Sequence, residues 1–323
     1  GDRGRQRADT NPRRSRHMSH REHRGRRVLG RSAGVLLALL LLVAVYGAAV
    51  EPRLILDERR HEADIPGLGP GWDGAEIAVF SDLQVGMWWD NSAMVQRVVD
   101  RVVEEDPAAV LIPGDFVYSS SPEVPAQVRT VMELLEPLAT AEIPRFVVLG
   151  NHDHAVGAVS ELTSAFEDAG FTVLDNEAVE MPGPEGASAG ADPLYVVGLA
   201  ATRPGLTDVD AALSEVPDGA PRIVMMHNPT AFPDLPAHAA PLAVAGHTHC
   251  GQIALPGTPR WSYVGLTEEE KVVADGFAPV DYGAPGNTMF VTCGIGFSVV
   301  PVRINAFPQV AFFELTPAPS VQR

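Results

Sequence analysis

Residues 76–84 read Glu-Ile-Ala-Val-Phe-Ser-Asp-Leu-Gln, a short apolar run that is followed at once by polar side chains. Continuous apolarity over this length predicts a strand that is covered on both faces of its sheet. Further runs of this kind lie at 109–113, 145–149, 194–197, 222–226 and 242–245. Two later runs, 288–291 and 310–315, predict the last strands. We therefore expect a domain built on buried strands.

Segments of helical periodicity lie between the first strands. Residues 92–106 place Met94 and several valines on one stripe, and Pro107 ends the pattern. Residues 128–138 and 155–169 predict weaker helices. The order strand, helix, strand, helix, strand predicts a layered α/β domain with several parallel strands. Residues 182–192 are low in complexity and predict a surface loop.

Side chains that can bind a metal follow five of the apolar runs. They are Asp82, Asp115, Asn151, His227 and the pair His247 and His249. Strand ends at one edge of an open α/β sheet are where ligands gather, because the loops there converge on a crevice. We therefore expect these scattered donors to meet in space.

The donor types narrow the choice of metal. Carboxylate, amide and imidazole groups without a thiolate suit manganese, iron or zinc, and they argue against a sulfur-bound structural zinc. The six donors, with Gln84 as a further candidate, exceed what one tetrahedral ion needs. Two divalent ions that share a carboxylate, about 3.5 to 4 Å apart, would use them all and would suit phosphoryl transfer.

Taken singly, most of these signals are weak. A lone histidine such as His227 is usually structural, and Gly114-Asp115 is a common turn sequence. His247 and His249 could belong to an exposed strand face, although two imidazoles at i and i+2 also suit a chelate. The run 268–270, three glutamates, is typical of a solvated surface. The order of the blocks is what favours a metal site.

The blocks Asp82-Leu-Gln84, Gly114-Asp115, Gly150-Asn-His-Asp153, His227 and Gly246-His-Thr-His249 resemble the calcineurin-like metallophosphoesterase family, in the family's order. The resemblance spans about residues 76 to 316. Residues 246–253 and 294–301 resemble its bacterial membrane-associated branch, which includes phosphodiesterases and lipid-precursor pyrophosphatases. The resemblance implies a four-layer α-β-β-α sandwich and hydrolysis of phosphodiester or pyrophosphate bonds.

The resemblance also implies a role for each matching residue. It assigns the first ion to Asp82, Gln84, Asp115 and His249, and the second to Asp115, Asn151, His227 and His247. Asp115 would bridge the two ions, and the water between them would attack phosphorus in line. His152 would stabilise the transition state or protonate the leaving oxygen. Asp153 would fix the tautomer of His152 and raise its basicity.

Gln84 departs from the family pattern, which is Asp-x-His. A glutamine offers a neutral carbonyl oxygen where an imidazole would be the better donor to a transition metal, so the first site would be weaker or would favour manganese. The alternative to an active enzyme is therefore a non-catalytic, membrane-tethered binding module with a degenerate metal site.

The N-terminal region predicts a membrane anchor. Residues 1–31 hold eleven Arg against three acidic residues and predict a basic cytoplasmic tail. Residues 32–50 carry no charge and would reach roughly 28 Å as a helix, enough to span a bilayer. A cleaved signal peptide is the alternative, because the stretch 46–50, Tyr-Gly-Ala-Ala-Val, offers small residues near a possible cleavage point. Both readings place the rest of the chain outside the cytoplasm, at the cell membrane for an uncleaved single-pass anchor.

The remainder of the chain is expected to hold a linker, 51–75, and one catalytic domain, 76–323. From residue 32 on, 13 basic and 38 acidic residues give a charge of 13 − 38 = −25. Such a surface repels a nucleic-acid backbone, so DNA or RNA is not expected as a partner. A phosphate-ester substrate is expected, and membrane attachment favours a lipid-linked one. The sequence predicts no oligomeric state.

Two pairs of residues carry hypotheses of their own. Cys250 and Cys293 are the only cysteines, and export would allow a disulfide between them. Trp88 and Trp89 follow the first ligands; they either cap the core or form a rim that meets a lipid or a flat organic group.

Overall fold

The computed structural model describes residues 12–184, 193–254 and 266–318, so most of the predicted loop 182–192 lies outside the described residues. The chain divides into two units, residues 1–46 and residues 47–323. The first contains the helix α1, Pro12–Val45. Within it begins the segment Arg26–Leu54, which has a mean hydropathy of 2.6 and is long and apolar enough to cross a membrane. This helical segment is longer than the predicted anchor.

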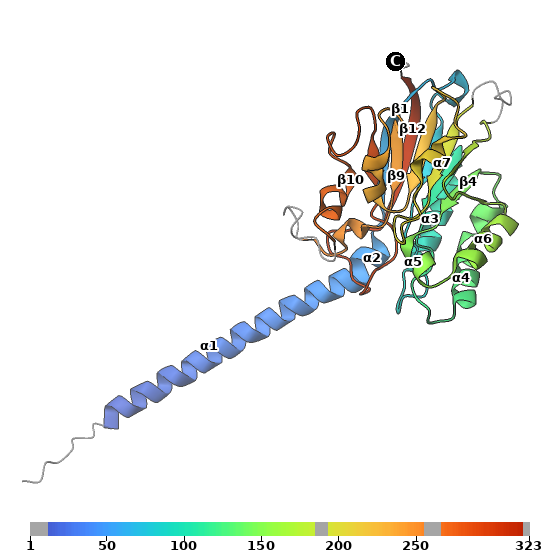
Figure 1. Cartoon of the computed structure of the whole chain (residues 1–323). Coiled ribbons are helices and arrows are strands. Elements are labelled where there is room, and N and C mark those ends of the chain that lie inside the picture. The colour runs from blue at the N-terminus through green and yellow to red at the C-terminus, as the bar shows by residue number, and fades with distance from the viewer. Residues whose placement is uncertain (1–11, 185–192, 255–265, 319–323) are drawn as a thin grey trace, which may run out of the picture. The chain divides into compact units, whose positions relative to one another are not determined.

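The second unit contains two six-stranded sheets (Figure 1). The first sheet has the order β1, β12, β2, β3, β4, β5. The bounds of its strands are β1 Asp57–Pro66, β12 Gln309–Ala318, β2 Glu76–Val79, β3 Ala109–Pro113, β4 Arg145–Val148 and β5 Thr172–Val173. Strands β2 to β5 run parallel, and β12 is antiparallel to β2. The centre of this sheet is therefore made of the predicted strands.

The second sheet has the order β10, β11, β9, β8, β7, β6. Its strands are β10 Gly276–Phe277, β11 Met289–Val291, β9 Leu242–Ala245, β8 Arg222–Met226, β7 Tyr195–Leu199 and β6 Glu177–Glu180. The four central strands run parallel, and the two edge strands are antiparallel to their neighbours. Its parallel strands end at a common edge, as those of the first sheet do.

Three cores show how the layers pack. Alternate residues of β2 to β4, such as Val79 and Leu111, pack between the sheets against Val196 and Ile223. The opposite face of the first sheet packs on α3 Ser92–Glu105, α4 Val124–Thr140 and α6 Val159–Asp168. The outer face of the second sheet packs on α7 Val209–Leu213 and two short 3-10 helices, η3 Pro229–Asp234 and η6 Glu270–Val273. The predicted four-layer α-β-β-α sandwich is confirmed.

The prediction of a linker at 51–75 was wrong. Residues Glu51–Leu54 form the short helix α2, and residues 57–66 form β1, which pairs along its whole length with β12. The sequence of β1 is highly charged and carries no apolar run. Because β1 lies at a sheet edge, its charges stay exposed, and Arg60 pairs with Glu76 and Glu105. Residues 57–66 form a strand because their backbone pairs with β12, and their own sequence has no apolar pattern that would predict it.

Candidate metal centre and active site

The loops after β2, β3 and β9 turn sharply at the edge where the predicted ligands lie. Five of the predicted metal ligands have a left-handed backbone: Asp82 (φ 56°), Gln84 (51°), Asp115 (59°), His247 (74°) and His249 (50°). Residues other than glycine seldom adopt this conformation, and it persists only where the surrounding structure enforces it. Such backbone conformations cluster at functional sites, which supports a functional role for this edge.

One group of donors gathers around His227, which is fully buried. Ligand atoms of Asp115, His227 and His247 all lie within 4.8 Å of one another. His227 Nε2 lies 3.2 Å from Asp115 Oδ2 and 3.0 Å from Asn151 Oδ1. Its Nδ1 lies 2.8 Å from the carbonyl oxygen of Pro113, which can only accept a hydrogen bond. A neutral His227 therefore carries its proton on Nδ1 and keeps the Nε2 lone pair for an ion.

A second group of donors lies on the other side of Asp115. Gln84 Nε2 donates to Asp115 Oδ2 at 2.9 Å, and His249 Nε2 lies 3.5 Å from both Gln84 Nε2 and Asp82 Oδ1. The Gln84 Oε1 oxygen is buried without a hydrogen-bond partner among the described residues. A buried oxygen without a partner is costly, and a cation would satisfy it. The donors present therefore fit a cation here as well.

Asp115 joins the two groups, because its Oδ2 atom contacts both His227 Nε2 and Gln84 Nε2. Burial would raise the pKa of Asp115, but the charge and hydrogen bond of His227 hold it below its ordinary value. Burial raises the pKa of Asp82, and repulsion from Asp115 adds to this effect. The two buried carboxylates therefore repel each other, and a bound cation would relieve that repulsion.

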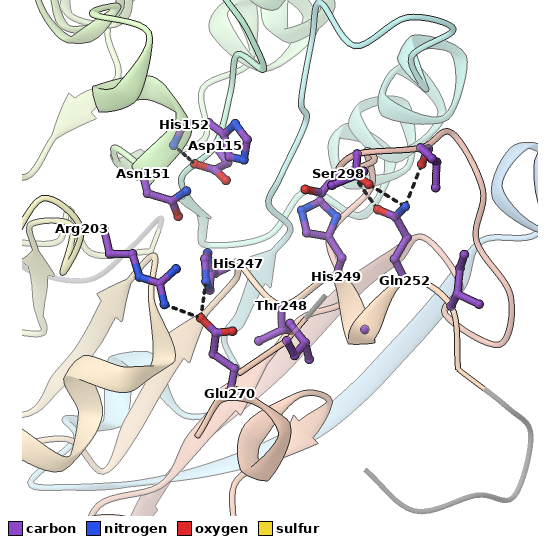
Figure 2. Close-up of a pocket in the computed structure, with 15 residues that line it drawn as sticks. Asp115, Asn151, His152, Arg203, His247, Thr248, His249, Gln252, Glu270 and Ser298 are labelled. Atoms are coloured by element: carbon purple, nitrogen blue, oxygen red, sulfur yellow. Dashed lines mark hydrogen bonds and ion pairs between the residues drawn. The ribbon is translucent and has the colours of Figure 1, made fainter. Parts of the chain in front are cut away.

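His247 is held by a residue that the sequence analysis missed. Its Nε2 lies 2.9 Å from Glu270 Oε1, which leaves Nδ1 for an ion (Figure 2). Glu270 is 3% exposed, so the interpretation of residues 268–270 as a solvated run was wrong for this member. Thr267 and Glu270 form reciprocal hydrogen bonds at the start of η6. The pattern Thr-x-x-Glu is a capping signature, and it was the sequence signal that could have identified Glu270.

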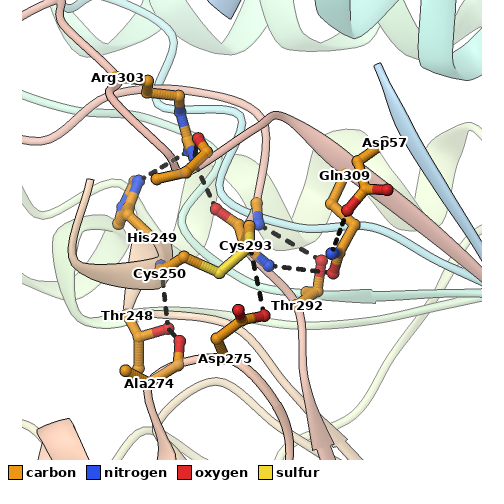
Figure 3. The surroundings of a disulfide bond; sticks show 12 residues. Asp57, Thr248, His249, Cys250, Ala274, Asp275, Thr292, Cys293, Arg303 and Gln309 are labelled. Carbon is orange, nitrogen blue, oxygen red and sulfur yellow. Dashed lines mark hydrogen bonds between the residues drawn. A yellow bond between two sulfur atoms is a disulfide. The ribbon is translucent and has the colours of Figure 1, made fainter. Parts of the chain in front are cut away.

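His249 is held by a second residue that the sequence did not reveal. Arg303 is fully buried, and its guanidinium donates to the carbonyl oxygens of Cys293, Gly296 and Ala306. Its Nη2 atom also lies 3.2 Å from His249 Nδ1 (Figure 3). Burial and the charge of Arg303 lower the pKa of His249 well below its ordinary value. His249 is therefore neutral. Because a guanidinium only donates, the contact with Arg303 leaves Nδ1 as the acceptor and places the proton of His249 on Nε2, so binding of an ion at Nε2 requires loss of that proton or of the bond to Arg303.

The structure contradicts the expected role of Asp153. Among the described residues no hydrogen bond joins its carboxylate to the His152 ring; it accepts hydrogen bonds from the backbone N–H groups of Gly150, Asp115, Phe116 and Val117 at 2.8 to 3.1 Å. These bonds tie the loop after β3 to the loop after β4. Asp153 is thus a structural anchor for the loops that carry Asp115 and Asn151.

His152 takes its orientation from Tyr118. The two rings stack with centroids 5.1 Å apart, and His152 Nδ1 lies 3.0 Å from the Tyr118 carbonyl oxygen. The Tyr118 carbonyl oxygen therefore accepts the hydrogen bond from the His152 ring that was expected to go to Asp153. A neutral His152 bears its proton on Nδ1. The backbone N–H of His152 donates to Asp115 Oδ1 at 2.9 Å. This bond fixes the histidine relative to the metal ligands.

A pocket of about 510 Å³ opens over these residues (Figure 2). The ligand side chains Asp115, Asn151, His247 and His249 form its base, together with His152. Arg203 is the one Lys or Arg among the described residues of its lining, and it lies 3.0 Å from Glu270. Ile253, Leu266, Val299 and Val300 give it an apolar side. The pocket can therefore hold an anionic group at its base and a hydrocarbon group along that side.

Two further hypotheses are settled by the structure. Cys250 and Cys293 form a disulfide, and Cys250 follows His249 directly (Figure 3). Trp88 and Trp89 are 66% and 53% exposed, so the interpretation that they cap the core was wrong.

The sequence profile of calcineurin-like phosphoesterases matches residues 75–251. YkuE, an uncharacterized metallophosphoesterase of Bacillus subtilis, is 26% identical over 270 residues, which cover 84% of this chain and 88% of the relative. Phosphodiesterase YaeI of Escherichia coli is 28% identical over 237 residues, with 69% and 76% covered. A transmembrane protein with metallophosphoesterase domain from Danio rerio is 27% identical over 293 residues, with 85% and 61% covered.

Among solved structures, a dimetal phosphatase from Danio rerio aligns with a TM-score of 0.41 and 12% identity, and covers 69% of this chain and 88% of that one. The match to the family profile runs from just before β2 to the turn after His249 and takes in more than half of the chain. The chain therefore belongs to the calcineurin-like phosphoesterase family.

Proposed function

We propose that the chain hydrolyses phosphodiester or pyrophosphate bonds of a lipid-linked substrate, with two divalent cations, on the outer side of the cell membrane. The family supports metal-dependent hydrolysis of phosphate esters. The finer proposal rests on one observation above all: donor groups lie on both sides of the buried Asp115, at the base of a pocket that has an apolar side.

The donor set supports two cations of the manganese, iron or zinc class. Asp82, Gln84 and His249 would hold one, Asn151, His227 and His247 the other, and Asp115 both. Bound ions of this kind activate water at neutral pH and polarise phosphoryl oxygens.

The chain's own side chains would orient the substrate and move the proton. His152 lines the pocket beside the ligands, and its Nδ1 donates to the Tyr118 carbonyl oxygen. Only the imidazolium form of His152 therefore carries a proton on Nε2, and that proton would pass to the leaving oxygen and leave a neutral imidazole. Arg203 would hold a second anionic group, which a pyrophosphate or a charged headgroup has and a simple monoester lacks. The apolar side of the pocket favours a leaving group that carries hydrocarbon.

The test uses the full chain, purified in detergent with manganese. We expect about two metal ions per chain and faster turnover of an aryl phosphodiester or a nucleotide-lipid pyrophosphate than of an aryl phosphomonoester. Asp115→Asn is expected to lose both metal and turnover. Faster turnover of the monoester would contradict the proposed substrate class.

The alternative is a membrane-tethered binding module, and the amide of Gln84 in place of an imidazole is the observation that favours it. One ion or none per chain, with no turnover of any of these esters, would support the module and end the proposal of an enzyme.

A further inference from the structure

The chain enters its second unit at Gly47, two residues after the end of α1, whose C-terminal part is apolar. The carbonyl oxygen of Gly47 accepts a hydrogen bond from the backbone N–H of Arg303 at 2.8 Å. A Cβ atom at Gly47 would lie 2.7 Å from Ile304 and 2.9 Å from Val302, so the chain lies tightly against this segment. Successive Cα atoms are about 3.8 Å apart, so covalent connection alone keeps Gly47 close to the apolar end of α1 at Val45.

Arg53 joins this entry point to the loop that carries the two tryptophans. Its Nη2 atom donates to the carbonyl oxygen of Trp89 at 2.7 Å, and its guanidinium lies 4.2 Å from the centroid of the Trp89 ring. The same guanidinium lies 5.2 Å from the Phe297 ring centroid. Asn91 Nδ2 donates to the carbonyl oxygens of Pro52 and Ile295 at 3.0 and 2.8 Å. Residues 51–54, 88–91 and 295–304 therefore form one packed block.

Five large apolar side chains of this block face solvent. Leu54 is 65% exposed, Trp88 66%, Trp89 53%, Val299 74% and Val300 38%. We name these five residues the rim. Single exposed apolar residues are ordinary, but a group on one packed block that includes two tryptophans is typical of an interaction surface.

The rim is continuous with the pocket. Val299 and Val300 line the pocket, and Gln252 fixes their segment by donating to the carbonyl oxygens of Ser298 and Val300. The backbone N–H of Val299 donates to the Tyr118 hydroxyl at 3.0 Å, and the Tyr118 ring stacks on His152. Whatever covers the rim therefore lies at the mouth of the pocket.

We propose that the rim rests on the surface of the bilayer that the apolar N-terminal segment enters, so that the pocket takes its substrate directly from the membrane. Tryptophan side chains favour the headgroup region, where an apolar ring and a polar N–H are both satisfied. The charge of 13 − 38 = −25 from residue 32 on disfavours attraction to an anionic surface, so apolar contact supplies the affinity. The substrate part of this inference rests on the proposed function; the contact itself does not.

The contact can be tested by tryptophan fluorescence. The full chain is reconstituted in phosphatidylcholine vesicles whose acyl chains are brominated either near the headgroup or deep in the bilayer. The other two tryptophans, Trp72 and Trp261, are present in both proteins, so the difference between wild type and Trp88→Ala/Trp89→Ala isolates the rim tryptophans. We expect stronger quenching by shallow bromines in the wild type, and loss of that excess in the variant. Equal quenching of the two proteins would overturn the proposal.

Turnover separates this inference from the proposed function. One probe is bis(p-nitrophenyl) phosphate in water, and the other is hexadecyl p-nitrophenyl phosphate in phosphatidylcholine vesicles. The double tryptophan variant is expected to raise KM for the embedded diester about tenfold and to leave kcat/KM for the soluble diester within about twofold. Val280→Ala, an exposed apolar residue whose neighbour Tyr282 packs against Phe232, is the control.

The outcomes are distinct. An unchanged KM for the embedded diester, with normal turnover of the soluble one, would overturn membrane delivery. No turnover of either probe, with the expected quenching, would keep the membrane contact and end the proposed function. A dimer in detergent that dissociates when both tryptophans are replaced would show that a second copy covers the rim and would overturn the proposal.

Discussion

Gln84 has a buried side-chain oxygen without a hydrogen-bond partner among the described residues, while its nitrogen donates to Asp115. If Oε1 is a metal ligand, Gln84→Leu removes a donor and is expected to weaken the weaker of two manganese-binding events by about tenfold or more. Gln84→His is expected to strengthen it, because imidazole is the better donor to transition metals. Titration calorimetry with manganese measures both.

Gln96→Leu is the matched control for these variants. Gln96 lies on α3, where its side chain donates to Asp100 Oδ1 at the surface, its one hydrogen bond to another side chain within the described ranges. If Gln84→Leu, Gln84→His and the wild type all bind manganese with the same affinity, Gln84 is not a metal ligand.

Glu270 orients His247 through its Nε2 atom, and carboxylates in such positions typically contribute 10- to 100-fold to metal affinity. Glu270→Gln keeps an oxygen for the hydrogen bond but loses the charge. We expect manganese affinity to fall by about tenfold. Glu268→Gln, two residues earlier and almost fully exposed, is expected to leave affinity unchanged. If the two variants bind manganese equally, Glu270 has no role in the centre.

The same residue gives a pH dependence to the metal-free protein. Burial would raise the pKa of Glu270, but hydrogen bonds from His247 and the backbone of Thr267 outweigh it and lower the pKa to about 2. A depressed pKa stabilises the fold above the ordinary value of 4.5, and this contribution is lost as the pH falls towards 2. The free energy of unfolding should therefore differ between wild type and Glu270→Gln at pH 7, and converge in acid.

At the scale of elements, the loops after β3 and β4 depend on Asp153. Asn at this position keeps one acceptor oxygen where the carboxylate serves four backbone N–H groups. Asp153→Asn is expected to lower the free energy of unfolding by on the order of 2 to 4 kcal/mol, measured with urea in the absence of metal. The exposed Asp168→Asn on α6 should change it by less than about 0.5 kcal/mol.

The family resemblance implied that Asp153 orients His152, the residue before it in the sequence. Residues 151–155 form the helix α5, in which successive side chains point in different directions and do not face each other. Asp153→Asn with full stability but lost turnover would restore the role that the sequence suggested. His152→Ala should lose turnover and keep stability.

The disulfide joins the loop after β9 to the loop after β11, across 43 residues. A cross-link over this length stabilises a protein by about 4 kcal/mol in the chain-entropy description. Cys250→Ala/Cys293→Ala is therefore expected to unfold at much lower urea concentration, and a reductant should lower the stability of the wild type alone. Equal midpoints for the oxidised wild type and the variant would contradict a stabilising role.

The sequence predicted those parts of the site whose signal is local. Asp82, Asp115, Asn151 and His227 each follow a buried strand, and strand ends meet at a sheet edge. Arg303 left no such signal, because its partners are backbone carbonyl oxygens of a loop whose path only the folded chain defines. The strand β1 was missed for a related reason, since its partner β12 lies more than 240 residues later. The position of Arg303 and the formation of β1 thus depend on contacts between residues far apart in the sequence.

At the scale of the whole molecule, the candidate centre joins the two sheets. Asp82, Asp115 and Asn151 follow strands of the first sheet, whereas His227 and His249 follow strands of the second. Bound cations would therefore cross-link the sheets and oppose the repulsion between Asp82 and Asp115. Metal should stabilise the domain as a unit, because unfolding must separate its ligands.

Removal of metal tests this coupling. An ion that binds only the folded state, at a free concentration of 100 times its Kd, adds about 2.7 kcal/mol to the free energy of unfolding. Calorimetric melting in manganese and then in a chelator should show one cooperative transition that moves to lower temperature without metal. Asp115→Asn, which lacks the shared ligand, should melt at the same temperature in both conditions. A wild-type Tm that does not respond to manganese would show that these donors do not bind the ion in the folded chain.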